Sequence, residues 1–160
     1  MKSFVSLLCL TLGLFSQQVW ADPAPFGLEI GKTTIKELKE KYKVTDAGEN
    51  KFSGGKMYSI KPSQIDFEGL QGVTTIFSND GKLLAVLTTL PKNKFDYLYD
   101  SLGKKYKLTA KEIPFVGNKS ATYLDGNTEI SLDAPHLSFE MSMNYISLDL
   151  LKAAKAQSSQ

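Results

Sequence analysis

The chain has 160 residues, and its 19 lysines and arginines against 17 aspartates and glutamates give a formal net charge of +2 at pH 7. Every basic residue is a lysine, whereas arginine is the side chain that forks onto phosphates and base edges. This composition gives no general attraction to nucleic acids or anionic membranes, and we expect neither a nucleic-acid partner nor a nucleotide site.

Residues 1–21 have the layout of a secretory signal peptide. Lys2 gives a positive start, an apolar segment follows, and Val19 and Ala21 place small side chains where a signal peptidase cuts. The apolar segment is shorter than the roughly 20 residues that cross a bilayer as a helix, so we expect no stable membrane anchor. We predict cleavage after Ala21 and a periplasmic or secreted protein; the alternative is a buried N-terminal helix.

Cleavage would leave a mature protein that begins at Asp22, with a net charge of +1 because Lys2 is the only charged residue removed. The single cysteine, Cys9, would be removed as well, and Leu8 before it is too large for a lipoprotein signal. The mature protein would then form no disulfide and would depend on an ordinary hydrophobic core. Its length predicts a single α+β domain over residues 22–160.

The first half of this domain, about residues 26–90, is predicted to be a helix followed by strands. Thr34 and Glu37 form a capping box before a stretch with helical apolar spacing. A strand is expected near residues 56–60. Two apolar runs around Asn79–Gly81 then give a strong hairpin signal.

The tripeptide Gly31-Lys32-Thr33 matches the last three residues of a phosphate-binding loop. A phosphate-binding loop has four residues between its two glycines, whereas only three lie between Gly27 and Gly31. The residues between them alternate like a short strand. We therefore interpret Gly31 as a turn and predict no nucleotide binding.

The second half, about residues 93–147, is predicted to follow the same order. Asn93 can cap a helix over residues 95–106, a strand is expected near residues 120–124, and a second hairpin turns at Asp133–His136. The tail that follows has helix formers and a possible cap at Ser147.

Three sequence matches recur in the same order in the two halves. They pair residues 41–45 with 105–109, residues 52–56 with 115–119, and the hairpin that starts at Gly72 with the hairpin that starts at Gly126. We infer two tandem α-β-β-β units, with helices packed on antiparallel sheet, followed by a C-terminal helix.

The opening segment FGLEIGKTTIKELKEKY, with its glycine, threonine cap and short helix, resembles that of small bacterial envelope modules. These include the small lipoprotein of the outer-membrane assembly machine and the secreted β-lactamase-inhibitor protein. The tandem layout is more similar to the inhibitor, whose two units place helices against an antiparallel sheet. The likeness implies fold and carries over no functional residue. The chain departs from these proteins because it lacks the inhibitor's disulfides and the lipoprotein signal.

No constellation of catalytic or metal-binding residues stands out. A serine triad needs a histidine, and the single one, His136, lies in a predicted turn where solvated residues are usual. A zinc site wants three or four ligands. Glu129 and Glu140 would share the wet face of the second sheet and could pair. We predict no catalysis, no metal and no cofactor, with a hydrolase using Glu129, Glu140 or His136 as an open alternative.

When Gly72 is aligned with Gly126, the first hairpin has apolar residues where the second has polar ones, and Met141, Met143 and Phe139 face the core. We hypothesise that an exposed apolar patch docks a partner. Its residues are Thr75, Phe77, Leu84 and Val86, with Phe67 from the longer loop of the first half. The alternative is that Ile65, Phe67 and Leu70, or the tail helix, cover this face. The exposure of Phe77 and Val86 decides between them.

We therefore expect a non-enzymatic exported binding protein that presents a sheet face and loops to a protein partner, as an inhibitor, immunity factor or assembly helper does. The alternative is a small-molecule or lipid carrier with an apolar pocket.

Overall fold

The computed structural model describes residues 22–158. A helix followed by four strands occurs twice along this part of the chain, and a further helix ends it. The first series is α1 (Ile35–Lys41), β1 (Val44–Glu49), β2 (Gly54–Ile60), β3 (Gly72–Ser78) and β4 (Leu83–Pro91). The second is α2 (Phe95–Gly103), β5 (Lys107–Glu112), β6 (Lys119–Asp125), β7 (Thr128–Ala134) and β8 (Glu140–Ser147), followed by α3 (Leu148–Ser158). Short 3-10 helices lie at η1 (Pro25–Gly27), η2 (Pro62–Gln64) and η3 (Lys92–Lys94). The signal peptide predicted for residues 1–21 lies outside the described range.

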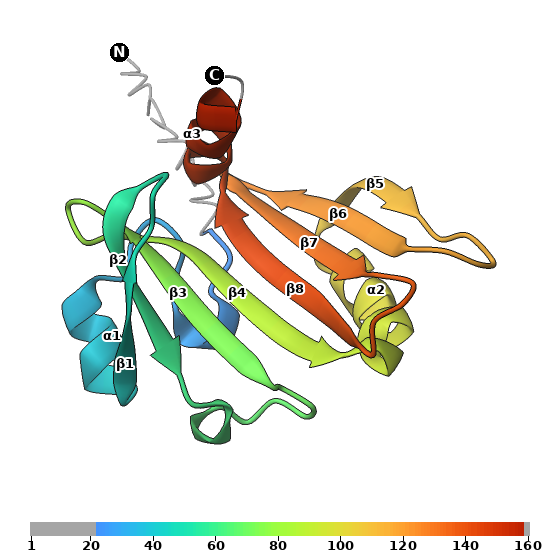
Figure 1. Cartoon of the computed structure of the whole chain (residues 1–160), viewed down its shortest axis with the longest axis horizontal. Coiled ribbons are helices and arrows are strands. Elements are labelled where there is room, and N and C mark those ends of the chain that lie inside the picture. Colours follow the sequence, from blue (N-terminus) through green and yellow to red (C-terminus); the bar gives the residue numbers. More distant parts are fainter. Residues whose placement is uncertain (1–21, 159–160) are drawn as a thin grey trace, which may run out of the picture.

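All eight strands form one antiparallel sheet in the order β1-β2-β3-β4-β8-β7-β6-β5 (Figure 1). The last strands of the two series, β4 and β8, pair at its centre, and β1 and β5 are its edges. The predicted α+β class is confirmed. The expectation of three strands in each half is wrong, because β1 and β5 add a fourth to each.

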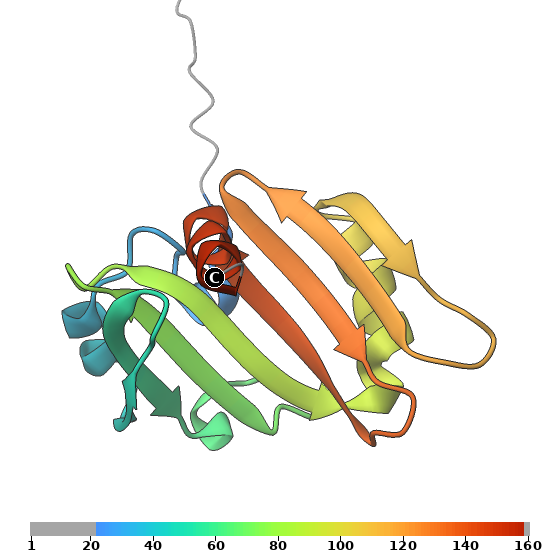
Figure 2. The same ribbon diagram turned by 45° about the horizontal axis from the view of Figure 1, so that its top comes forward.

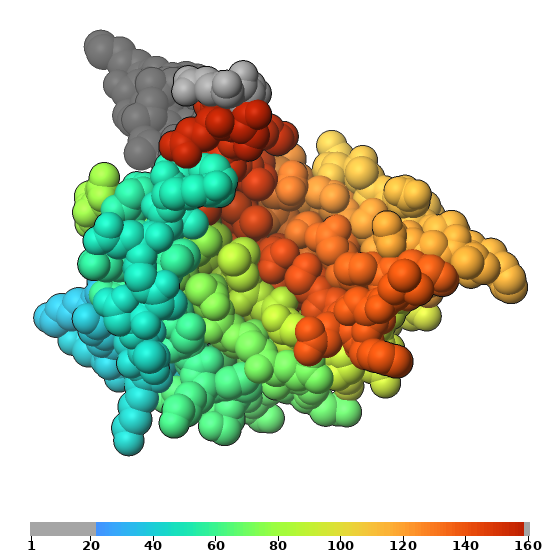
Figure 3. Space-filling view, viewed as in Figure 1, coloured from blue at the N-terminus to red at the C-terminus, as the bar shows by residue number. Residues whose placement is uncertain are grey.

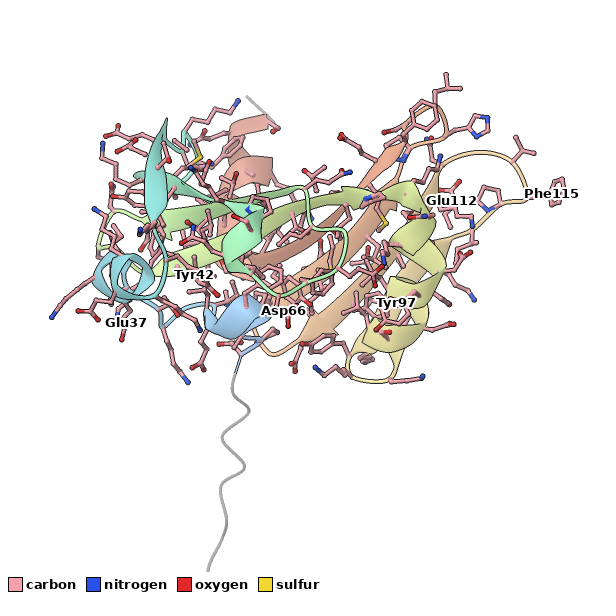
Figure 4. All side chains as sticks on the ribbon, turned by 90° about the horizontal axis from the view of Figure 1, so that it is seen from below. Glu37, Tyr42, Asp66, Tyr97, Glu112 and Phe115 are labelled. Atoms are coloured by element: carbon pink, nitrogen blue, oxygen red, sulfur yellow. The ribbon has the colours of Figure 1, made fainter. Side chains whose placement is uncertain are left out.

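The sheet has one covered face and one open face. The larger core lies between the sheet and α1, η1 and α2, which Figure 4 shows on the same side of the sheet. Leu38 of α1 and Phe95 of α2 are buried there against residues such as Phe77 and Tyr123. On the other side, α3 packs against β4 and β8 at one end of the face, through Leu150 over Ala85. Figure 2 shows α3 crossing above these strands, with the rest of the face uncovered.

The capping box predicted before α1 is confirmed. The hydroxyl of Thr34 accepts a hydrogen bond from the main-chain N–H of Glu37 at 3.3 Å, and the Glu37 carboxylate accepts from the N–H of Thr34 at 2.7 Å. Ser147 likewise caps α3, because its hydroxyl accepts from the N–H of Leu150 at 3.3 Å. The cap predicted at Asn93 is wrong: η3 precedes α2, whose N-cap residue Lys94 makes no side-chain cap.

The turn predicted at Gly31 is confirmed. Its φ of +80° lies in the left-handed region that glycine enters without steric cost, and its N–H donates to the carbonyl of Leu83 at 2.8 Å. The short strand expected just before it is wrong. Leu28 and Ile30 are buried alternately, as in a strand, but they pair with no neighbouring strand in the described sheet. The hairpin predicted around Asn79–Gly81 joins β3 to β4.

Candidate functional site

The exposed apolar patch expected on the first hairpin is not present. Thr75, Phe77 and Val86 are each 0% exposed. They lie on the covered face, where the Thr75 hydroxyl donates to the main-chain carbonyl of Tyr58 at 3.1 Å and the ring of Phe77 packs edge-to-face on Tyr58. Leu84 is half-buried and belongs to the smaller cluster beneath α3. These four residues therefore form no common exposed surface.

The physical reason is an alignment error of one position. The buried residues of the two hairpins correspond when Thr75 is paired with Ile130, Phe77 with Leu132, and Val86 with Met141. The alignment of Gly72 with Gly126 is shifted by one position from this pairing. Successive side chains of a strand point to opposite faces, so the shift exchanges the covered face for the open one. The patch residues were thus assigned to the wrong side of the sheet.

The alternative, that loop residues cover this face, is confirmed. Ile65, Phe67 and Leu70 pack against the larger core, and Phe67 meets the ring of Phe26 edge-to-face at 5.7 Å between ring centres. Phe67 is therefore part of a lid on the core. The tail helix covers the opposite face instead, through Leu150.

For the second hairpin, the prediction of which residues face the core is correct at two of three positions. Met141 and Met143 were expected to face the core, and they are 2% and 3% exposed. Phe139 was expected beside them and is 94% exposed, because it lies in the loop before β8 rather than in the strand.

The open face carries a continuous row of mostly small side chains. Strand register aligns Thr45, Ser59, Thr74, Leu87, Asn144, Ser131 and Thr122 across β1, β2, β3, β4, β8, β7 and β6. All but Thr45 are half-buried, and Thr45 is exposed. Leu87 supplies an apolar side chain in the middle of the row, between Thr74 and Asn144. Figure 3 shows this face hollowed along β4 and β8, with the β1–β2 hairpin raised on one flank.

Charges on the open face are confined to the second half of the sheet. By strand register, the acidic residues there are Glu112, Glu129, Asp133 and Glu140, with Lys107 on the outermost strand. Glu129 is level with Ile146, and Glu140 begins the same strand, β8, six positions earlier. That stretch of strand spans about 20 Å, against the roughly 5–10 Å that separates the two carboxylates of a glycosidase. The structure thus does not bring Glu129 and Glu140 together.

His136 is exposed in the β7–β8 loop, where its main-chain N–H donates to the Asn118 side chain at 2.8 Å. Within residues 22–158, no three histidine, aspartate or glutamate side chains cluster as metal ligands would. No helix in this range is long and apolar enough to cross a membrane.

An aromatic groove of about 280 Å³ lies on the helix side of the sheet. Its lining includes Phe26, Phe67, Tyr97, Tyr106 and Tyr145. Burial raises the pKa of both Tyr106 and Tyr145 above the ordinary value of 10. Lys105 is the one formally charged side chain among the groove residues. Sequence reasoning missed the groove because its residues come from η1, a loop, α2 and β8.

The chain was compared with protein-family models, curated proteins and solved structures. None of them matches. The function must therefore be inferred from the geometry of the molecule itself.

Proposed function

We propose that this chain is a non-enzymatic exported binding protein, and that the open face is the surface it presents to a protein partner. The observation that supports this most directly is that no helix of the described residues covers the face outside α3, although a row of mostly small side chains lines it across seven strands and is half-buried on six of them. At roughly 4.8 Å between strands, the row is about 30 Å wide. That width suits a standard protein interface, which buries about 800 Å² on each partner.

The composition of the face fits a protein better than a small molecule. Leu87 gives an apolar centre, while Thr74, Asn144 and Ser131 give hydroxyl and amide groups around it. An apolar centre with a polar rim is the usual anatomy of a protein interface. Small side chains also allow the main chain of a partner to come close.

Export is part of the proposal and is supported by the layout of residues 1–21. The proposed absence of catalysis is supported by the distance between Glu129 on β7 and Glu140 at the start of β8. His136, the remaining catalytic candidate, lies in an exposed loop rather than in an enclosed site.

We further propose that the two halves are tandem copies of one α-β-β-β-β unit. The order of elements supports this duplication, as does the constant spacing between corresponding buried positions on both strands of the hairpins. The resemblance to the β-lactamase-inhibitor-protein type supports the same layout. In that arrangement both copies contribute strands to one binding face.

Site-specific crosslinking tests the proposed surface. Cys9 is the only cysteine, so the exported protein offers no competing thiol. A photoactivatable group attached to Ser131→Cys should capture a stoichiometric protein from periplasmic extract. The control is Lys104→Cys, an exposed position just after α2 on the other side of the sheet. Equal capture from both positions, or none from Ser131→Cys, would contradict the proposal.

The aromatic groove favours a second candidate function, a carrier of small apolar molecules. Its volume is close to the lower end of the range for ligand pockets. Native mass spectrometry of the exported protein would detect a bound small molecule. Ser101→Trp should fill the groove and release that molecule, whereas Ser63→Trp, on an exposed residue of η2, should not. A protein without bound ligand would rule out this function for the groove.

A further inference from the structure

Two neighbouring loops expose large apolar side chains at one end of the sheet. The β5–β6 loop carries Phe115, which is 104% exposed, and Val116, which is 67% exposed. The β7–β8 loop carries Leu137 and Phe139, each 94% exposed. Figure 4 shows Phe115 at the outermost point of its loop, pointing away from the sheet. We call these four side chains the loop tips.

Hydrogen bonds hold the two loops together. The main-chain N–H of His136 donates to the side-chain oxygen of Asn118 at 2.8 Å, which joins the β7–β8 loop to the β5–β6 loop. The ammonium of Lys92 donates to the main-chain carbonyls of Pro135 and His136, and its N–H donates to the carbonyl of Phe139 at 2.8 Å. The exposure of Leu137 and Phe139 is therefore a feature of a loop fixed at several points.

The tips are uncharged, and the charged residues, which have both signs, lie behind them. Residues 113–118 and 134–139 contain no lysine, arginine, aspartate or glutamate. Glu112 and Lys119 flank the first of these segments, and Asp133 and Glu140 flank the second. Lys119 forms an ion pair with Asp96 of α2 at 3.1 Å, which holds it toward the body of the protein. This arrangement lets the apolar tips enter a membrane interface while the charged groups behind them stay in water.

Main-chain chemistry favours the same environment. Each loop contains a proline, Pro114 or Pro135, which has no N–H that must leave water when the loop is buried. The tips are also convex and narrow. A protein partner would need a matching cavity for each, whereas a fluid bilayer accepts a convex apolar projection without one.

We propose that the loop tips insert shallowly and reversibly into the surface of a phospholipid bilayer. The insertion is apolar rather than electrostatic, because the exported chain has a net charge of only +1 and the tips have none. The loops lie at the end of the open face away from α3, so most of that face stays accessible while the tips are inserted (Figure 1). The bilayer contact of the loop tips and the binding of a partner to the open face can therefore be tested independently.

Tryptophan fluorescence gives a direct test. Residues 22–160 contain no tryptophan, since the only one is Trp20. The exported Phe115→Trp protein would be titrated with vesicles of phosphatidylcholine, and with vesicles that also contain phosphatidylglycerol. We expect its emission to shift to the blue with both compositions. Ser63→Trp, at an exposed position on η2, is the control and should not shift.

Loss of the rings should weaken vesicle binding. Phe115→Ser and Phe139→Ser should each lower the partition coefficient by about tenfold, as expected for burial of one phenylalanine side chain. Leu108→Ser, which removes an exposed apolar side chain outside the loop tips, is the matched control and should leave it unchanged. Because all three positions are exposed, the variants should keep the wild-type thermal midpoint.

Four outcomes would overturn the proposal. The first is an unchanged Phe115→Trp spectrum at saturating lipid. The second is binding confined to phosphatidylglycerol vesicles and retained in both serine variants, which would indicate adsorption by charge. The third is a concentration-dependent dimer that these variants abolish, which would assign the tips to a second copy. The fourth is a blue shift caused by a soluble protein fraction and not by vesicles.

Discussion

The hydroxyl of Thr88 donates a hydrogen bond to the main-chain carbonyl of Met143, across the strand pair where the two halves of the sheet meet. Thr88 is 3% exposed, so water cannot easily replace this bond. We predict that Thr88→Val lowers the free energy of unfolding by about 1 kcal/mol, measured by urea denaturation. Thr89→Val, at the half-buried neighbour on the open face, should change it by less than about 0.5 kcal/mol. Equal losses would show that the bond contributes nothing specific.

The cap of α1 gives a second prediction. Thr34→Ala removes the side-chain oxygen that accepts from the N–H of Glu37. We expect the free energy of unfolding to fall by about 1 kcal/mol, the usual cost of losing a threonine cap. Thr33→Ala, one residue earlier and outside the cap, is the control for loss of a threonine side chain. A cap that matters should make the Thr34 variant clearly the less stable of the two in thermal or urea unfolding.

The same cap should make stability depend on pH. The main-chain N–H of Thr34, and then its hydroxyl, hold the pKa of the Glu37 carboxyl below its ordinary value of 4.5. A lowered folded-state pKa stabilises the fold above the unfolded-state value, and this contribution is lost as the pH falls through the folded-state value. We expect Glu37→Gln to be less stable than wild type at pH 7 and this difference to shrink below about pH 4.5. A difference that stays constant with pH, or a Glu37 carboxyl that titrates normally by NMR, would contradict this.

Thr128 should tolerate replacement by an apolar isostere. It is 0% exposed, and its hydroxyl has no hydrogen-bond partner within residues 22–158. Leaving a buried hydroxyl unpaired costs on the order of 1–3 kcal/mol, so Thr128→Val should raise the free energy of unfolding by about 1 kcal/mol. Thr122→Val on the open face is the comparison and should have little effect. A destabilised Thr128→Val protein would indicate that the hydroxyl is bonded in solution.

Buried tyrosines should make the fold sensitive to alkali. Burial raises the pKa of Tyr123 from 10 to about 12 and also raises that of Tyr145. Because these hydroxyls ionise more readily in the unfolded chain, stability is complete below about pH 10 and falls as the pH rises through the folded-state value. Tyrosinate absorbance should therefore develop late and together with unfolding. Tyr123→Phe should make the loss of stability above pH 10 less steep; an unchanged slope would exclude Tyr123 as its source.

Sequence patterns within a few residues predict helices and strands that have a regular buried face, and turns that need particular residues. The α1 cap at Thr34, the turn at Gly31 and the hairpin around Asn79–Gly81 are set by residues within a few positions of one another, so the sequence alone indicates them. The edge strands β1 and β5 were missed because almost all their residues are exposed. A strand without a buried face has no alternating pattern to detect.

The predicted binding surface is on the wrong face of the sheet because contacts between residues far apart in sequence determine which face is covered. Whether Phe77 faces helices or solvent depends on a shift of one position, and the hairpin containing it has an irregularity between Ile76 and Phe77. Alternation indicates which residues share a face but not which face is covered. That depends on where α2 and α3 pack, and α3 lies far from β3 in sequence. The exposure of Phe139 had no sequence signal, because an apolar loop residue resembles the start of the strand that follows.

The outermost strand β5 carries one lysine for each side of the sheet: Lys107 toward the open face and Lys111 toward the helices. Its outer edge nevertheless offers unpaired main-chain groups to any strand that approaches, and charged side chains are the common device against such growth. These two ammonium groups therefore oppose the pairing of another strand with this edge. Without them, the edge strand of one molecule could pair with an edge strand of the next, and the protein would assemble into a continuous intermolecular sheet.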